Sequence, residues 1–251
     1  MFKNTEMPEN LVAGRNPVTE LLRSDRATDK ILMLKDAGGS LNKIAAMARE
    51  RGIPIKEVTR EKLDFLCPGI NHQGVAAYAA AAQYAELEDI YAKAGDEPLF
   101  VVIADGIEDP HNLGAIIRTA YAAGAHGIII PKRHGVGLTP TVMKSSAGAA
   151  EHLLVARVAN LASTVEELKK RNVWVYSADM DGQPWCSVDY SGAAALIVGS
   201  EGEGVSRLLK DKSDVTVSLP MENGFDSLNA SVAAGIILYE IMRQRKGIKA
   251  K

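Results

Sequence analysis

Short apolar runs alternate with helix-like segments through the second part of the chain, and this alternation constrains the fold more than any other feature. It begins with the run Leu99–Ala104 and continues to a helical pattern that ends at Ile241. Strands that are separated by helices pair in parallel, and a parallel sheet is covered by helices on both faces. The sequence therefore predicts an α/β domain with a mostly parallel sheet.

The period of the apolar residues and the turn residues between them place the individual elements. Strands are predicted at Leu99–Ala104, Gly127–Ile130, Val155–Val158, Trp174–Ala178, Ala195–Val198 and Val215–Leu219. Helices are predicted at His111–Gly124, Thr139–His152, Thr164–Arg171, Val205–Lys210 and from Leu228 to Ile241. Asn112, Thr164 and Ser227 are the expected N-caps of their helices, because short polar side chains accept the free N–H groups of a first turn.

A smaller alternating unit precedes this part, over Leu11–Tyr78. Its predicted strands are Lys30–Leu34, Ile53–Val58 and Gln73–Ala79, and its predicted helices are Asn16–Leu22, Leu41–Arg51 and Glu61–Leu66, with Ser40 and Thr59 as caps. An alanine-rich and then acidic segment, Ala80–Pro98, is typical of a linker with one helical turn at Leu87–Tyr91. We therefore expect a small α/β domain at 1–79, a linker at 80–98 and a second domain at 99–251.

The composition excludes several classes of protein. No apolar run among the 251 residues has the length of a membrane span, and no leader-like segment opens the chain, so a cytoplasmic protein is expected. Cys67 and Cys186 show no pairing or ligand spacing, and the five histidines are scattered, so we predict free thiols and no metal site. A formal net charge of −2 argues against a protein that coats nucleic acid, but it leaves room for a local basic surface.

Three polar clusters follow predicted strands, at the sheet edge where α/β proteins bind small ligands. The first contains Asn112 and is followed by Arg118, which lies in a helix otherwise rich in alanine and isoleucine. Arg118 is either a surface arginine that extends to solvent or a guanidinium that binds phosphate in a bidentate manner.

The second cluster is the glycine-rich turn Gly199–Gly204, in which glycine allows close approach of the backbone to a ligand. Its Glu201 is either a plain loop carboxylate or a group that orients a substrate or Arg118. The third cluster, Ser227–Ser231, has more polar residues than a helix cap requires. The sequence has no Walker A loop, no dinucleotide fingerprint after a first strand and no hydrolase elbow, which disfavours the corresponding enzymes.

Together the three clusters resemble the signature motifs of the SpoU–TrmH family of RNA ribose 2′-O-methyltransferases. The matching residues are Asn112 with Arg118, the turn Gly199–Gly204, Leu219-Pro220-Met221, and Ser227-Leu228-Asn229. The N-terminal residues Gly14–Val18 and His72–Val75 resemble the small ribosomal-protein-like domain of the subgroup that modifies a guanosine of bacterial 23S rRNA. The loop Glu222–Asp226 departs from the family pattern, because it is bulkier and more acidic than usual.

This resemblance implies a deep C-terminal trefoil knot, a homodimer, S-adenosylmethionine as methyl donor and no metal. It also implies an RNA partner, 23S rRNA before others, and no membrane or DNA partner. The implied cofactor contacts are Gly199, Leu219 and Leu228. The implied catalytic residues are Asn112, Arg118, Glu201, Ser227 and Asn229, with Arg118 on the phosphate beside the target ribose.

Three other functions stay open from the sequence. A tRNA 2′-O-methyltransferase would carry the same motifs. A non-catalytic RNA-binding protein of ribosome assembly could keep the fold, although the joint presence of Asn112, Arg118, Ser227 and Asn229 argues against lost activity. A nucleotide-binding oxidoreductase is disfavoured by the missing fingerprint.

Overall fold

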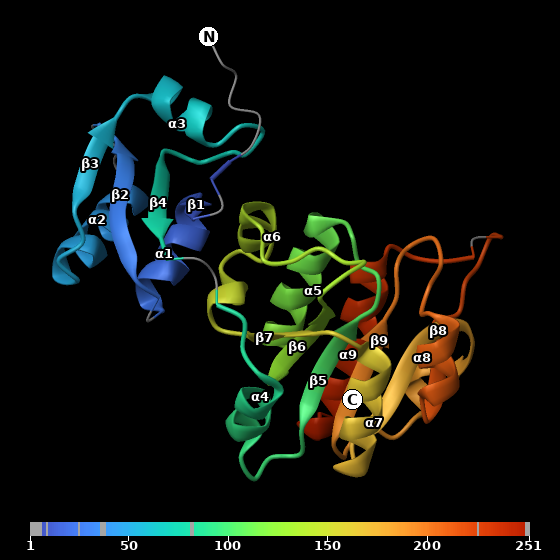
Figure 1. Cartoon of the computed structure of the whole chain (residues 1–251). Helices are drawn as coiled ribbons and strands as arrows, with labels where there is room; N and C mark the ends of the chain where they lie inside the picture. Colours follow the sequence, from blue (N-terminus) through green and yellow to red (C-terminus); the bar gives the residue numbers. More distant parts are fainter. Residues whose placement is uncertain are drawn as a thin grey trace. The chain divides into compact units, whose positions relative to one another are not determined.

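The computed structural model describes residues 7–8, 10–24, 26–35, 39–80, 83–224 and 226–248. The chain divides into two compact units (Figure 1). The first comprises Met1–Gln83 with Leu138–His152, and the second comprises Tyr84–Gly137 with Leu153–Lys251.

The second unit is built on a six-stranded sheet in which every neighbouring pair of strands is parallel. In sheet order the strands are β10 (Val215–Ser218), β8 (Trp174–Pro184), β9 (Ala194–Val198), β5 (Phe100–Ala104), β6 (Gly127–Pro131) and β7 (Leu154–Val158). The predicted parallel α/β sheet is confirmed. Since β5 and β9 are central neighbours, the loops that follow them leave the same edge of the sheet side by side.

Helices cover both faces of this sheet (Figure 1). They are α4 (Leu87–Ala94), α5 (Pro110–Ala122), α7 (Leu161–Lys170), α8 (Arg207–Lys212) and α9 (Ala230–Arg245). Helices α4, α7 and α8 supply Ile90, Val165 and Leu209 to one core cluster. Helices α5 and α9 pack against each other, and their Ile117 and Leu238 are fully buried. Burial on both faces explains why the strands are apolar without alternation.

Two helices of the second unit begin earlier than the sequence indicated. Helix α5 is capped by Asp109, whose carboxylate accepts a first-turn N–H at 2.8 Å, and Pro110 opens the helix. Helix α7 is capped by Asn160. The predicted caps Asn112 and Thr164 are therefore wrong. An acceptor directly before proline is the better start, because proline fits the first helical position.

Strand β8 extends to Pro184, well beyond the predicted end at Ala178, because it continues beside β10. The pairing shifts register between Thr216 and Val217. A Cβ atom at Gly182 would lie 2.6 Å from the backbone of Thr216. A side chain at position 182 would therefore separate the two strands.

Helix α4 occupies the middle of the segment that the sequence suggested as a linker, 80–98. It has eight residues instead of one turn, and its side chain Ile90 is fully buried in the core of the second unit. Glu86 and Asp89 form a reciprocal capping box at its start. Both capping residues lie in an acidic stretch, and acidic composition is also typical of a linker, which is what the sequence predicted here.

The first unit contains a four-stranded sheet in the order β1-β4-β2-β3, in which only β2 and β3 are parallel. Its elements are β1 (Leu11–Ala13), α1 (Arg15–Arg23), β2 (Thr28–Leu34), α2 (Ser40–Glu50), β3 (Ile55–Val58), α3 (Arg60–Leu66) and β4 (Val75–Ala79). The predicted cap Thr59 is confirmed, since its hydroxyl accepts the Lys62 N–H at 3.4 Å. Ser40 is the first helical residue and not a cap. Strand β1 was not predicted, because three residues carry no period.

Residues 138–152 also belong to the first unit. The sequence predicted one helix here, but the structure has α6 (Pro140–Ser145) and a short 3-10 helix, Ala149–Glu151. They are separated by Ala147 and Gly148, both with positive φ. The Arg26 guanidinium binds the Glu151 carboxylate at 2.7 Å, which ties the segment to the N-terminal residues.

The cysteines are both free: Cys67 is buried and Cys186 is exposed. Burial raises the pKa of the Cys67 thiol to about 11. In the residues that the structure describes, no helix is long and apolar enough to cross a bilayer.

Candidate active site

Three loops meet at the carboxyl edge of the central strands. They follow β5, β9 and β10, and they contain the three polar clusters that the sequence singled out. Asp105 links the first loop to the second, because its Oδ2 accepts the Ser206 N–H at 2.7 Å. Asp105 is not among the expected site residues, although its position directly after the strand is a usable signal.

Asn112, Glu201 and Asn229 come together from three distant segments. The Asn112 Nδ2 donates to Glu201 Oε1 at 2.9 Å, and the Asn229 Nδ2 donates to Asn112 Oδ1 at 2.9 Å. The Asn229 Nδ2 also donates to Glu201 Oε1. Asn112 is buried, while Glu201 and Asn229 are exposed. The cluster thus has a fixed base and an open side, which suits the positioning of a substrate.

Asn229 is held in this cluster by its second role as the N-cap of α9. Its Oδ1 accepts the N–H groups of Ser231 at 3.0 Å and Val232 at 3.3 Å, together with the Ser231 hydroxyl at 2.6 Å. With Oδ1 occupied by the helix, Nδ2 faces Asn112 and Glu201. The predicted cap Ser227 is therefore wrong: the cap is Asn229, and α9 begins at Ala230, three residues after Ser227.

The glycine turn after β9 is closed on itself. Ser200 and Gly204 exchange two backbone hydrogen bonds of 3.2 and 3.0 Å. A Cβ atom at Gly199 would lie 2.0 Å from the Gly204 carbonyl carbon, which no relaxation of a side chain can relieve. Glycine at position 199 is therefore a requirement of this turn.

A cavity of about 630 Å³ opens beside the turn, a size typical of small-ligand sites. Gly199, Leu219 and Leu228 all line it, as do Glu201 and Ser227. The structure thus brings the three expected cofactor contacts to one cavity. Of the loop that departs from the family pattern, Asp226 lines the cavity and Phe225 lies outside the described residues.

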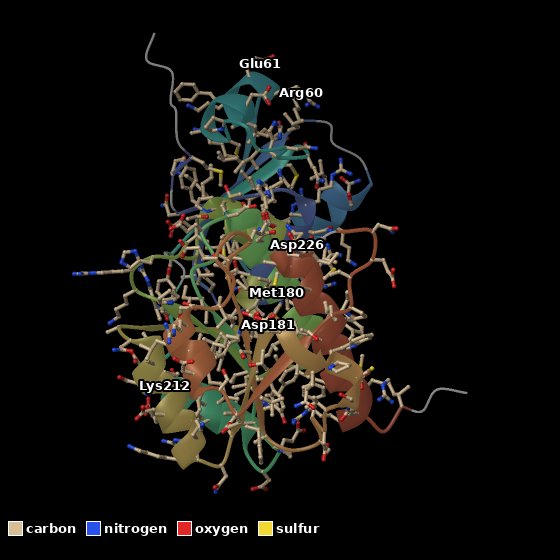
Figure 2. All side chains as sticks on the ribbon, turned by 90° about the vertical axis from the view of Figure 1, so that its right-hand side faces the viewer. Arg60, Glu61, Met180, Asp181, Lys212 and Asp226 are labelled. Atoms are coloured by element: carbon tan, nitrogen blue, oxygen red, sulfur yellow. The ribbon has the colours of Figure 1, made fainter. Side chains whose placement is uncertain are left out.

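The cavity wall is acidic. Its charged lining residues are the carboxylates Asp179, Asp181, Glu201, Glu203 and Asp226 and the single ammonium of Lys210. Figure 2 labels Asp181 and Asp226 together with another lining residue, Met180. Lys210 Nζ binds Asp179 Oδ1 at 2.9 Å, and this hydrogen bond raises the pKa of Lys210. Since one lysine cannot balance these carboxylates, the wall favours a positively charged ligand. Sequence reasoning missed Asp179 and Asp181, because the strand was expected to end before them.

Arg118 and Ser227 lie outside the hydrogen-bonded cluster. Arg118 is exposed on α5 and has no hydrogen bond or ion pair with the described residues. Ser227 is exposed on the cavity wall. The described residues contain no group of three His, Cys, Asp or Glu side chains that could hold a metal ion.

Comparisons with known proteins agree with this geometry. The profile of the SpoU rRNA Methylase family matches residues 99–239, and that of the RNA 2′-O ribose methyltransferase substrate-binding domain matches residues 11–85. A Bacillus subtilis (strain 168) protein, YacO, described as a TrmH family tRNA/rRNA methyltransferase, is 48% identical over 94% of this chain and 96% of its own.

Two solved structures extend the comparison. The SpoU methyltransferase AviRb of Streptomyces viridochromogenes, in complex with the cofactor AdoMet, is 25% identical, with a TM-score of 0.81 over 95% of this chain and 91% of its own. The TrmH/SpoU tRNA modifying enzyme of A. aeolicus is 28% identical, with a TM-score of 0.54, but it covers 63% of this chain and 81% of its own. The matched profiles and the extent of identity show that this chain belongs to the SpoU family of RNA methyltransferases.

Proposed function

We propose that this protein transfers the methyl group of S-adenosylmethionine to the 2′-hydroxyl of a ribose in 23S rRNA, with a guanosine as the target nucleoside. The observation that carries the proposal is the convergence of Asn112, Glu201 and Asn229 beside an acidic cavity that Gly199, Leu219 and Leu228 line. The proposed cytoplasmic location follows from the RNA substrate.

The residues of the cavity fit the methyl donor. S-adenosylmethionine carries a sulfonium and an ammonium, and when bound it supplies a methyl group that is already activated for transfer. The carboxylates of the wall complement both positive charges. Gly199 provides backbone that a ligand can approach closely, while Leu219 and Leu228 provide apolar surface.

The chain's own residues then have to orient the ribose and manage one proton. The 2′-oxygen forms a bond to the methyl carbon as the carbon–sulfur bond breaks, and the hydroxyl proton must leave. We assign Arg118 to the phosphate beside the target ribose, where a guanidinium binds in bidentate geometry. A free guanidinium is practically always protonated, so this ion pair serves to stabilise the developing alkoxide or to pass the proton to the phosphate.

Asn112, Asn229 and Ser227 complete the ribose site in this proposal. The two amides are fixed by Glu201 and by the start of α9, so their remaining polar groups have defined directions. Ser227 offers a hydroxyl on the cavity wall. Fixed donors of this kind lower the barrier because they need no reorganisation during transfer.

The first unit supports an rRNA substrate over tRNA. The tRNA modifying enzyme that resembles this chain matches only 63% of it, whereas the substrate-binding profile covers residues 11–85. We propose that the first unit binds rRNA and that the second unit, which includes α4 of the expected linker, is catalytic. A cavity of about 750 Å³ in the first unit has Arg15, Arg23 and Lys43 in its wall. Glu20 of the same wall pairs with Arg23 at 2.6 Å, which leaves Arg15 and Lys43 to bind phosphate.

We further propose the homodimer and the trefoil knot that the family resemblance implies. Exposed apolar side chains support the dimer: Val232, Ile236 and Tyr239 of α9 are 50%, 39% and 48% exposed, and Tyr121 of α5 is 45% exposed. A two-fold contact through α9 would bury them. The knot is supported by the cavity wall, to which the glycine turn and the residues before α9 both contribute.

The test is transfer of a labelled methyl group to unmodified RNA made in vitro. We expect label in a 23S rRNA transcript and none in tRNA transcripts, and nuclease digestion should release a 2′-O-methylguanosine. Label in tRNA alone would replace the rRNA proposal by the tRNA one. Binding of RNA without any transfer would instead favour a non-catalytic assembly protein.

A further inference from the structure

A basic loop follows β6 at the carboxyl edge of the large sheet. It comprises residues 131–137, Pro-Lys-Arg-His-Gly-Val-Gly, and we call it the basic loop. Strand β6 is the neighbour of β5, the strand that leads into the turn before Asn112. Because the strands are parallel, the basic loop leaves the sheet at the same edge as the candidate active site.

The backbone of the basic loop is held in place at both ends. The Lys132 N–H donates to the Val158 carbonyl at 2.8 Å, and the Val136 N–H donates to the Ile107 carbonyl at 2.9 Å. Ile107 is buried in the turn between β5 and α5, so the loop is joined to the segment that carries Asn112. Exposed side chains on such an anchored loop have a defined place beside the site.

The charges of the basic loop are not neutralised by the described residues. Lys132, Arg133 and His134 are all exposed, and none has a hydrogen bond or ion pair from its side chain to a described residue. Most cations of the helices on this unit differ in this respect. Ion pairs join Lys169 to Asp214, Arg207 to Asp211, Lys210 to Asp179, Lys212 to Glu166 and Arg243 to Glu240.

A further cationic side chain, that of Arg157, contacts the backbone of the basic loop. The Arg157 guanidinium donates to the Lys132 carbonyl at 3.1 Å and lies over the Tyr84 ring, 5.2 Å from its centre. Its buried Nε has no hydrogen-bond partner among the described residues. Lys132 and Arg133 of the basic loop and Arg157 of β7 (Leu154–Val158) thus place three cationic groups at this part of the unit, whereas the wall of the methyl-donor cavity is acidic.

We infer that the basic loop binds the RNA backbone next to the target ribose, through ion pairs of Lys132 and Arg133 with phosphates. This rests on the proposed function. An exposed and anchored loop suits an extended polyanion, whereas a small anion would need an enclosing pocket. Such contacts fix the position of the RNA and carry no sequence information. Lys132 and Arg133 are therefore positioning residues, separate from the methyl-donor cavity.

The test compares two double variants with equal loss of charge. K132Q/R133Q removes both cations of the basic loop. The control K170Q/R171Q removes two exposed cations at the C-terminal end of α7. Because β8 begins at Trp174, this end of α7 lies at the amino edge of the sheet, opposite to the candidate active site. Arg171 stacks on Tyr91, so melting curves must show that the control stays folded. Binding and transfer are measured with an unmodified 23S rRNA transcript over a series of salt concentrations.

We expect K132Q/R133Q to raise the KM for the transcript about tenfold and to leave kcat at saturating RNA and affinity for S-adenosylmethionine unchanged. A plot of log affinity against log salt has a negative slope, and each lost phosphate contact should make that slope less steep by about 0.7 to 0.9. The control should keep the wild-type KM and slope. The variant K132R/R133Q keeps one cation in the basic loop. It should recover most of the RNA affinity that K132Q/R133Q loses.

Equal losses in the two double variants would mean that net charge alone matters, and the inference would be wrong. A wild-type KM and salt slope in K132Q/R133Q would also overturn the inference. Because that variant would still transfer the methyl group, the proposed function would be unaffected. A wild-type enzyme that transfers no label to any RNA would refute the proposed function, and the inference with it. Wild-type RNA affinity in K132Q/R133Q combined with lost binding of an acidic protein would reassign the loop to a protein partner.

Discussion

The Asn229 side chain donates a hydrogen bond of 2.9 Å to the side chain of Asn112, 117 positions earlier in the chain. The same Asn229 caps α9 through its other side-chain atom. One amide thus connects the start of the last helix to the helix that follows the first strand of the sheet. Fold stability and site geometry depend on the same residue, and variants can separate the two.

Asn229→Ala should lose both roles. Loss of an N-cap costs about 1 kcal/mol, so Tm should fall by a few degrees. Methyl transfer should fall at least about 100-fold, since Asn112 and Glu201 lose their shared partner. Asn229→Ser is the matched control, because serine caps helices well but cannot reach both partners. Recovery of Tm without recovery of kcat is expected, and full recovery of both would show that only the cap matters.

Gly199→Ala should abolish binding of S-adenosylmethionine. The added methyl group would lie 2.0 Å from the Gly204 carbonyl carbon, so the turn that lines the cavity must open. Gly202→Ala is the control in the same turn, because its Cβ would meet no atom within 4 Å. Calorimetry should give wild-type affinity for Gly202→Ala and none for Gly199→Ala. Equal affinities would remove the turn from the cofactor site.

Arg118→Ala should abolish methyl transfer and keep S-adenosylmethionine binding. Arg118 is exposed and unpaired with the described residues, so its loss should leave Tm within about 1 °C. Arg118→Lys should stay well below wild-type activity, because lysine cannot bind phosphate in bidentate geometry. Labelled-methyl transfer to the 23S rRNA transcript measures both. Retained turnover in Arg118→Ala would exclude Arg118 from the mechanism.

Arg15→Gln and Lys43→Gln together should weaken binding of the 23S rRNA transcript about tenfold. Both residues line the cavity of the first unit, where they would neutralise phosphates. Affinity for S-adenosylmethionine should not change. Arg15 also binds Ser40 and Gln73, so the melting curve must be compared with wild type. Unchanged RNA affinity in a folded variant would place the RNA elsewhere on this unit.

Ile236→Asp should convert the proposed dimer to a monomer. Ile236 lies on the exposed apolar side of α9, and a buried aspartate in a two-fold contact would face its own copy. Leu208→Asp on α8 is the control, since Leu208 is also exposed and apolar, at 58%. Sedimentation velocity should give a monomer for Ile236→Asp and the wild-type species for Leu208→Asp. A monomeric wild type would contradict the dimer at once.

The strands of the large sheet could be predicted because each is a short apolar run between turn residues. Most helix starts could not, because several polar residues compete for each cap and only packing decides among them. The start of α3, capped by the predicted Thr59, is the exception. Asp109 precedes a proline and caps α5, which leaves Asn112 free to turn toward Glu201. The grouping of Asn112, Glu201 and Asn229 followed from family resemblance, since no spacing in the sequence relates residues so far apart. The role of Arg118 stays a prediction, because its exposed side chain has no hydrogen bond or ion pair with the described residues.

The assignment of residues 138–152 to the first unit has a consequence for any attempt to dissect this protein. The polypeptide passes between the units three times, after residues 83, 137 and 152. A fragment that starts at residue 99 would carry α6 without its packing partners and would present the buried Val142 and Met143 to water. The small unit is therefore not a contiguous N-terminal domain that could be removed by truncation. Evolution could exchange it for another RNA-binding module only by rebuilding the middle of the methyltransferase as well.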